Sequence, residues 1–378
     1  MTFTMHKIKK TIFNSIPLIP GFKTSKKILV IESDDWGTIR TSSKQNYLNL
    51  LEKGYPIDQN PYCKFDSLEN DQDIQILLET LSSVKNSYNQ NPIFTFNNVV
   101  ANPNFEKIKA SQFNEYYFEP FYETHSKYDG HSNVMNLYHE GIKNKLLYPQ
   151  YHGREHLNVN RWLKSLQKQE QHVLDGLEND MFSFAWLKNN SYRNEYMDSF
   201  DIDELNELPN QEKIFTEGYN LFEKIWNFKS TSFIANCYIW HPQLEKFATK
   251  VGVKYFQGLP FQFIPSLKKH YNYTKKFHYM GQVSKNNITY LVRNSFFEPS
   301  VYPNVDWIDS ALNRINLAFK FNKPAILSSH RLNFIGGINE NNRTKNIQKF
   351  EELLKTIVKK WPDIEFMASN TLGDYITK

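Results

Sequence analysis

The chain has 378 residues and a formal net charge of +5, with 40% hydrophobic, 15% aromatic and 22% charged residues. Intrinsic disorder is excluded, because it requires low hydrophobicity together with high net charge. The 14 Gly and 16 Pro are also too few for a collagen-like or linker-like chain. The length fits two domains or one large α/β barrel. The positive charge is spread along the chain without a nucleic-acid-binding motif, so we expect no nucleic-acid partner.

The termini and cysteines indicate a soluble, cytoplasmic protein. Cys63 and Cys237 are far apart and form no CxxC pair, so no disulfide framework is expected. Residues 1–25 form an N-terminal extension that begins with a basic segment. The apolar stretch at 11–22 is too short and too interrupted for an integral membrane segment or a signal peptide. Peripheral membrane association through this extension is the alternative.

Short apolar runs that resemble buried strands alternate with segments of helical periodicity. The strand candidates are residues 27–32, 92–100, 146–151, 181–186, 232–239, 253–256, 288–293, 325–329 and 364–368. The helix candidates are residues 73–84, 160–175, 212–228, 242–251, 305–321 and 344–361. This alternation predicts βα units and a mostly parallel sheet, either a closed or nearly closed barrel or an open doubly wound sheet. Residues 102–147 lack a strong strand signal and are expected to form an inserted helical segment.

Asp34 and Asp35 end the first apolar strand, where the C-terminal edge of a parallel sheet would place catalytic groups. Two adjacent carboxylates are costly if they are buried without partners. A bend at the strand end would let one carboxylate bind a cation while the other acts as a base. The alternative is that one of the two caps the following helix.

His152 and His156 follow a later strand with a spacing of four residues. On a helical turn this spacing places both rings on one face, where both can reach one metal ion. Two histidines and one aspartate suit zinc and leave a position open for water. The segment also fits the HxxEH motif of inverted zinc proteases, with Glu155 as the base on a continuous helix.

His330 directly follows the apolar run at 325–329, so it too would lie at the catalytic edge of the sheet. A histidine there can act as a general acid and protonate a leaving group. The alternative is a hydrogen-bonded loop histidine without a catalytic role.

In chain order, these three motifs resemble those of the NodB-homology polysaccharide deacetylases, carbohydrate esterase family 4, as a divergent member. Residues 33–37 (SDDWG) resemble the family's TFDDG, residues 152–156 (HGREH) its H-S/T-x-x-H, and residues 326–330 (ILSSH) its late strand ending in His. The resemblance spans about residues 26–376. It implies a deformed (β/α)7 barrel in one domain, residues 26–378, with the insertion at about 102–147.

The resemblance also implies roles for individual residues. Asp34 would be the general base and His330 the general acid, with a divalent metal, expected to be Zn²⁺, held by three ligands: Asp35, His152 and His156. Two departures stand out. Gly153 replaces the Ser or Thr of the motif, and the family's third-motif Arg is absent near residues 233–240. Arg293 or Arg154 would then brace the catalytic aspartate.

The implied function is metal-dependent removal of an acetyl group from an acetylated sugar or polysaccharide. Three other functions remain open: cleavage of a glycosidic bond or of a non-peptide C–N bond on the same barrel, and glycan binding without catalysis. Six aromatic residues flank the proposed strand ends and are expected to line a glycan cleft or to pack in the core: Trp36, Tyr151, Tyr238, Trp240, Phe296 and Phe297. Asn236 is a further candidate contact to the substrate.

Overall fold

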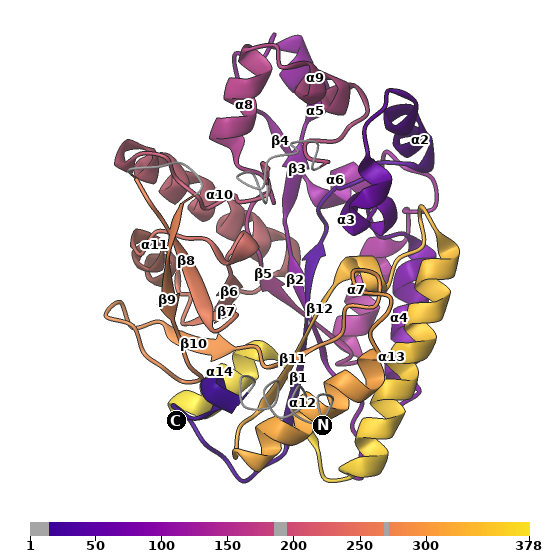
Figure 1. The fold of residues 1–378 in the computed structure, drawn as a ribbon, viewed down its shortest axis with the longest axis vertical. Helices are drawn as coiled ribbons and strands as arrows, with labels where there is room; N and C mark the ends of the chain where they lie inside the picture. The colour runs from indigo at the N-terminus through magenta and orange to yellow at the C-terminus, as the bar shows by residue number, and fades with distance from the viewer. Residues whose placement is uncertain (1–14, 185–194, 268–271) are drawn as a thin grey trace, which may run out of the picture.

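The computed structural model describes residues 15–184, 195–267 and 272–378. A large, parallel sheet occupies its centre, with strand order β10-β7-β6-β5-β2-β1-β12-β11 and with β13 also paired to β1 (Figure 1). The strands are β1 (Ile28–Trp36), β2 (Phe94–Asn98), β5 (Leu147–Tyr151), β6 (Ser232–Ile234), β7 (Tyr255–Gly258), β10 (Thr289–Val292), β11 (Ser295–Phe296), β12 (Ala325–His330) and β13 (Glu365–Met367). The predicted α/β architecture with a mostly parallel sheet is therefore confirmed.

The predicted barrel does not close through hydrogen bonds in the described part of the chain. Strands β10 and β11 lie at opposite edges of the sheet but are consecutive in sequence, so two residues connect the edges. The backbone N–H of Arg293 donates to Gly258 beside one edge, and that of Asn294 donates to Ile326 beside the other. The chain thus closes the sheet covalently at Arg293–Asn294.

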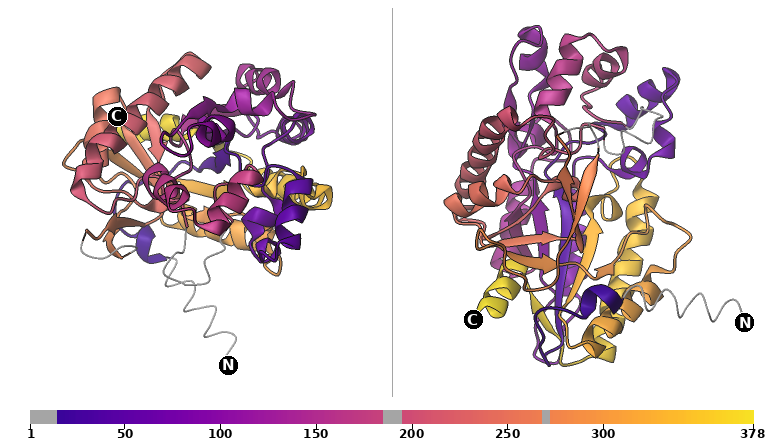
Figure 2. Two further views of the ribbon diagram at one scale, coloured as in Figure 1. Left: turned by 90° about the horizontal axis from the view of Figure 1, so that it is seen from above. Right: turned by 60° about the vertical axis from the view of Figure 1, so that its left-hand side comes forward.

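Helices cover the sheet and gather above one of its ends. The helices are α2 (Lys44–Glu52), α3 (Pro61–Phe65), α4 (Asp71–Ser82), α5 (Phe105–Ala110), α6 (Phe121–His125), α7 (Val134–Lys143), α8 (Val159–Gln167), α9 (Gln171–Glu178), α10 (Leu208–Trp226), α11 (Gln243–Val251), α12 (Trp307–Lys320), α13 (Glu340–Lys360) and α14 (Ser369–Thr377). Helices α4, α7 and α13 lie on one side of the sheet and α10 and α11 on the other, while α2, α5, α8 and α9 form an upper group (Figures 1 and 2).

Two hydrophobic cores match this arrangement. The main core packs the sheet against its flanking helices, and β1 is buried over its whole length. A second core joins Ile39, just beyond β1, to side chains of α5, α8 and α9 in the upper group. In the described residues, two antiparallel strand pairs complete the fold: β3 (Ala101–Pro103) with β4 (Phe118–Pro120), and β8 (Phe261–Pro265) with β9 (Tyr273–Phe277).

Local signals explain both the matches and the misses. Helix α4 begins at a capping box formed by Asn70 and Asp73, which satisfies two otherwise unpaired backbone N–H groups. The helix expected at 160–175 is two helices, because Gln169 between them has a left-handed φ of 57°. The strand expected at 181–186 is wrong for residues 181–184, which form none, and residues 185 and 186 lie outside the described part.

Residues 102–147, expected to be an insertion, hold α5, β4, α6 and α7. Their side chains enter both cores: Tyr138 packs in the main core and Ile108 in the second. Among the described helices, none combines the length and the apolar character needed to cross a bilayer.

Candidate functional site

The parallel sheet brings the ends of three strands together. Strands β1 and β12 are neighbours, and their register places Asp34 beside His330. Strand β2 lies on the other side of β1, and β5 follows it, with His152 immediately after the last residue of β5. Because parallel strands end at the same edge, groups from segments nearly 300 residues apart converge there.

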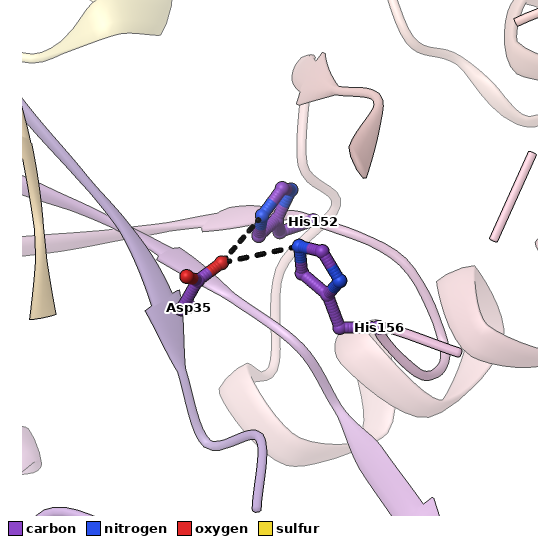
Figure 3. A group of neighbouring side chains, drawn as sticks. All are labelled: Asp35, His152 and His156. Atoms are coloured by element: carbon purple, nitrogen blue, oxygen red, sulfur yellow. Dashed lines mark hydrogen bonds and ion pairs between the residues drawn. The ribbon is translucent and has the colours of Figure 1, made fainter. Parts of the chain in front are cut away.

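Asp35, His152 and His156 form a compact, buried group at this edge (Figure 3). One carboxylate oxygen, Oδ1 of Asp35, lies 3.3 Å from Nε2 of each histidine. The three candidate ligand atoms lie within 4.8 Å of one another. The structure therefore contains a buried Asp-His-His group that could bind a metal ion.

The hydrogen bonds of His152 fit such an ion. Its Nδ1 lies 2.9 Å from the carbonyl oxygen of Ile234, which can only accept, so Nδ1 carries the proton. In the neutral ring, Nε2 then presents a lone pair to the Asp35 carboxylate, so two hydrogen-bond acceptors face each other. A cation bound between them would remove the repulsion. Burial alone would raise the pKa of Asp35, but positive charge on the imidazoles of His156 and His152 would hold it well below its usual range, and a bound cation would act in the same direction. Imidazole and carboxylate ligands suit zinc.

The two histidines converge for a different reason from the one predicted. Residues 152–158 form a loop, so the expected helical turn is wrong. Gly153 has a φ of +113°, a conformation that glycine adopts readily. The carbonyls of Gly153 and Arg154 accept backbone hydrogen bonds from Val100 and Ala101, which anchor this loop against the chain after β2. The two rings meet edge to face, with centroids 5.3 Å apart.

The inverted zinc-protease alternative fails on the same segment. Its base, Glu155, would need a continuous helix, and none is present at 152–158. The Glu155 carboxylate instead accepts hydrogen bonds from Arg154 Nε at 2.6 Å and from the Tyr116 hydroxyl at 3.1 Å. Arg154 also pairs with Glu217. Arg154 is thus engaged with acids other than Asp34.

A backbone bend gives the adjacent aspartates different surroundings. Asp35 has a left-handed φ of 76°, and the pairing of β1 with β2 changes register between Ser33 and Trp36. A non-glycine residue in this conformation is strained, and such strain often accompanies functional sites. The bend allows Asp35 to face the histidines while Asp34 faces the interior of the sheet.

Arg293 holds Asp34 through both carboxylate oxygens. Its Nη1 and Nη2 donate to Oδ2 and Oδ1 at 2.6 Å each, and Asn97 donates to Oδ1 at 2.7 Å. Burial alone would raise the pKa of Asp34, but the Arg293 guanidinium lowers it to about 2. Arg293 is fully buried and also donates from Nε to Glu32 at 2.6 Å. Of the two arginines considered from the sequence, Arg293 is the one against Asp34.

His330 approaches Asp34 from the neighbouring strand. Its Nε2 lies 3.9 Å from Asp34 Oδ2, and its Nδ1 lies 2.7 Å from Glu298 Oε1. Burial would lower the pKa of His330, but Glu298 and, more weakly, Asp35 and Asp34 raise it to about 10. The side chain is 22% exposed, against 3–8% for the three candidate metal ligands and Asp34. His330 therefore lies toward the accessible side of the site as a protonated imidazolium.

A buried carboxylate links the two strand ends that carry these groups. Glu69 accepts the backbone N–H of Gly37, which follows β1, at 3.0 Å. It also accepts from Arg331, which follows His330, at 2.7 Å. The hydroxyl of Tyr138 donates to the same carboxylate at 2.6 Å. Glu69 thereby fixes the end of β1 relative to the end of β12.

The remaining candidate contacts lie in two different environments. Asn236 is buried and donates to the carbonyl of His152 at 3.2 Å, while its own Oδ1 has no hydrogen-bond partner in the described part of the chain. The Tyr238 hydroxyl accepts from Arg293 at 3.2 Å and the residue is half-buried. Both side chains therefore contact the candidate site directly.

The six aromatic residues near the strand ends divide between the core and half-buried positions. Four of the six rings are core residues, no more than 3% exposed: Trp36, Tyr151, Trp240 and Phe297. Trp36, for example, donates to Ser33 Oγ and packs against Phe94 and Phe334. Tyr238 and Phe296 are half-buried. The reason is geometric: side chains at strand ends alternate between the site and the core beneath the helices.

Sequence reasoning missed several partners at the site, among them Glu298, Asn97 and Glu32. Glu298 lies just beyond β11, which pairs with β12, so a strand at 295–296 would have placed it beside His330. That strand has two residues, too few to produce a recognisable pattern. Asn97 and Glu32 lie inside strands. A polar residue there can be assigned to the site only when the face of the sheet toward which it points is known to be polar.

No family model and no curated protein matches the chain. Solved structures with a similar course of the chain include 4-α-glucanotransferase from Thermococcus litoralis, with a TM-score of 0.46 and 9% identity over 93% of this chain and 40% of that one. A protein from Mycobacterium smegmatis assigned as a polysaccharide deacetylase has a TM-score of 0.43 and 10% sequence identity, and the match covers 95% of this chain and 94% of that one. A GH57-type branching enzyme from Pyrococcus horikoshii has a TM-score of 0.43 and 8% sequence identity, and the match covers 93% of this chain and 70% of that one. The chain thus spans well under half the length of the glucanotransferase.

Proposed function

We propose that this protein is a metal-dependent hydrolase that removes an acetyl group from an acetylated sugar or polysaccharide. One observation carries the proposal: a buried Asp-His-His group lies beside a carboxylate held by arginine, with a protonated histidine on the neighbouring strand. Acyl transfer to water requires an electrophile, a base and an acid at one point, and these groups are of the required types.

Asp35, His152 and His156 are the residues that would hold a divalent cation. Bound there, such a cation would polarise the acetyl carbonyl and make a water nucleophilic at neutral pH. The described residues give the region a small excess of negative charge, because four are acidic (Glu32, Asp34, Asp35 and Glu298) and three are cationic (Arg40, Arg293 and His330). This excess favours retention of a cation.

Asp34 would accept the proton of the attacking water. Its Oδ1 already accepts two hydrogen bonds, from Arg293 and Asn97, while Oδ2 accepts one from Arg293. Oδ2 therefore keeps a lone pair for a proton, and it is the oxygen nearer to His330. Arg293 fixes the orientation of the carboxylate and keeps it ionised, which is the form a base requires.

His330 would protonate the departing amine or alcohol. A general acid must carry its proton before the leaving group departs, and Glu298 keeps the ring protonated to about pH 10. The hydrogen bond of Nδ1 to Glu298 directs Nε2 toward Asp34 and the candidate metal ligands. The base and the acid thus lie on adjacent strands at the same end of the sheet.

The test is release of acetate from acetylated sugars and chito-oligosaccharides by the purified protein after metal removal and after zinc is restored. We expect activity only with metal, and its loss in Asp34→Asn, His152→Ala and His330→Ala. Glu352→Gln on the exposed face of α13 is the matched control and should retain full activity. Equal activity of Asp34→Asn and the wild type would overturn the proposal. Cleavage of glycosidic bonds without acetate release would favour the glycosidase alternative.

A further inference from the structure

Arg40 is a buried cation near the candidate metal group, with no carboxylate at ion-pair distance among the described residues. Asp66, the buried acid that feels its charge, is held by Arg331. Arg40 lies four residues beyond the end of β1 and is 7% exposed. Its Nη1 donates to the sulfur of Met197, which is a weak acceptor. Its Nε is buried and has no hydrogen-bond partner among the residues that the structure describes. Four of its five N–H bonds are thus left without an acceptor in the described residues.

Other buried arginines of the molecule are paired differently. Arg293 holds Glu32 and Asp34 at 2.6 Å, Arg331 holds Asp66 and Glu69, and Arg343 holds Asp73 at 2.6 Å. Burying a guanidinium without an anionic partner is strongly unfavourable, because its hydration is lost and nothing replaces it. We therefore expect the counter-ion of Arg40 to be an anion from outside the chain.

The surroundings place Arg40 at the edge of the candidate active site. Its guanidinium lies over the ring of Tyr62, 5.4 Å from the centroid. The same ring meets His330 edge to face at 5.5 Å. Arg40 also lies within electrostatic reach of His156, one of the candidate metal ligands. Arg40 thus lies across the ring of Tyr62 from a residue of the candidate site, because that ring contacts both Arg40 and His330.

We propose that Arg40 and Tyr62 form a subsite for an anionic substituent, a carboxylate or a phosphate, carried by the substrate. A guanidinium presents parallel N–H donors that match the paired oxygens of either group. Tyr62 is half-buried and offers a ring face against which the apolar side of a sugar can pack. The substrate would accordingly be an acetylated acidic sugar, such as a uronic acid or a sugar phosphate. That it is a sugar rests on the proposed function; the anion site itself does not.

The test measures binding directly, in the zinc-loaded Asp34→Asn protein, so that no turnover is needed. Isothermal titration calorimetry compares an O-acetylated oligogalacturonate with its methyl ester, and N-acetylglucosamine 6-phosphate with N-acetylglucosamine. Each pair differs by its anionic group, and the two pairs separate carboxylate from phosphate. Arg40→Met and Arg40→Lys are the variants. Arg314→Met is the matched control, since Arg314 stacks on Phe296 at 4.9 Å without an acidic partner in the described residues.

We expect the charged member of at least one pair to bind about 10- to 100-fold more tightly than its neutral partner, the range for a charge-assisted hydrogen bond. Arg40→Met should abolish that preference, Arg40→Lys should reduce it, and Arg314→Met should leave it intact. Equal binding of both members in both pairs, or a preference that survives in Arg40→Met, would overturn the proposal. If Arg40→Met does not fold, Arg40→Lys and Arg40→Gln decide the outcome in the same way.

These results remain separable from the proposed function. An Arg40-dependent preference for the anion in a protein that never releases acetate would leave the subsite standing and remove the deacetylase activity. Acetate release with no preference for either anion would do the opposite.

Discussion

Arg293 holds both carboxylate oxygens of Asp34 although the two residues are 259 positions apart in the sequence. The same guanidinium also binds Glu32, which lies two residues before Asp34 on β1 and therefore on the same face of the strand. One cation therefore compensates two buried acids, and its position between the edges of the sheet sets the orientation of the proposed base.

Replacement of Arg293 by Met should destabilise the fold strongly. Two buried carboxylates would lose their counter-ion, which costs about 3–5 kcal/mol for one broken buried pair. Unfolding in urea measures the loss. Glu32→Gln in the same protein should recover part of it, because one uncompensated charge is removed. A double variant no more stable than Arg293→Met alone would show that Glu32 and Arg293 are not coupled.

Removal of a candidate metal ligand should abolish metal binding without unfolding the chain. The unaltered protein is expected to bind about one zinc ion per chain, and Asp35→Asn and His152→Ala far less. Metal analysis after dialysis gives the stoichiometry, and circular dichroism checks the fold. His139→Ala, at an exposed position against Trp226, is the control. Equal zinc content in all these proteins would place the metal elsewhere.

The pH dependence of activity should follow Glu298. The pKa of His330 is raised to about 10, chiefly by the Glu298 carboxylate, so the general acid stays protonated until the pH approaches that value. Glu298→Gln removes the negative charge, the pKa falls toward about 6.5, and activity should decline at lower pH than in the wild type.

The measurement is kcat/KM between pH 5 and pH 10 for the wild type and Glu298→Gln, with Glu352→Gln as the surface control. A merely structural role of Glu298 would lower activity equally at every pH. An unchanged alkaline limb in Glu298→Gln would therefore contradict the assignment of His330 as the acid.

Gly153 should be intolerant of substitution for two separable reasons. Its φ of +113° disfavours any side chain, and an added Cβ would lie 3.2 Å from Asn236 Oδ1 and 3.3 Å from the Glu155 carbonyl. Gly130 also has a positive φ, of +78°, but a Cβ there would meet open space. Gly130→Ala should cost only the backbone strain, about 1 kcal/mol. Gly153→Ala should cost more in thermal unfolding and also weaken zinc binding, which titration measures. Equal zinc affinity in both variants would show that the loop tolerates the change.

The part of the fold that could be predicted from the sequence is the set of strands that are continuous apolar runs. Strands β1 and β12 are continuous runs that read clearly, and their shared direction alone brings Asp34 to His330. The absence of hydrogen-bonded closure in the described part of the chain could not be predicted, because β11 has only two residues and the two edges are joined by a two-residue connection. The pairing of β8 with β9 could not be predicted either, because β8 is only partly buried and β9 is mostly exposed and contains two lysines, so neither is a buried apolar run.

The candidate site was predictable in its residue types and less so in its geometry. The spacing of His152 and His156 suggested a helical turn, whereas a left-handed glycine bends a loop to the same effect. Arg154 and Arg293 could not be separated from sequence, because the choice depends on which strand edges meet. For the aromatic residues near the strand ends, the choice between the site and the core could not be made from the sequence, because position along a strand does not reveal which face a ring occupies.

The covalent link at Arg293–Asn294 has a consequence for how catalysis and folding would be related. Because the residue that orients Asp34 is also the first of the two that join the sheet's edges, the base can be correctly oriented only when both edges have docked. Loosening of either edge would disorient the carboxylate before the core beneath it is exposed. Loss of acetate release during gentle heating should therefore precede the cooperative unfolding transition, making the reaction a reporter of edge docking.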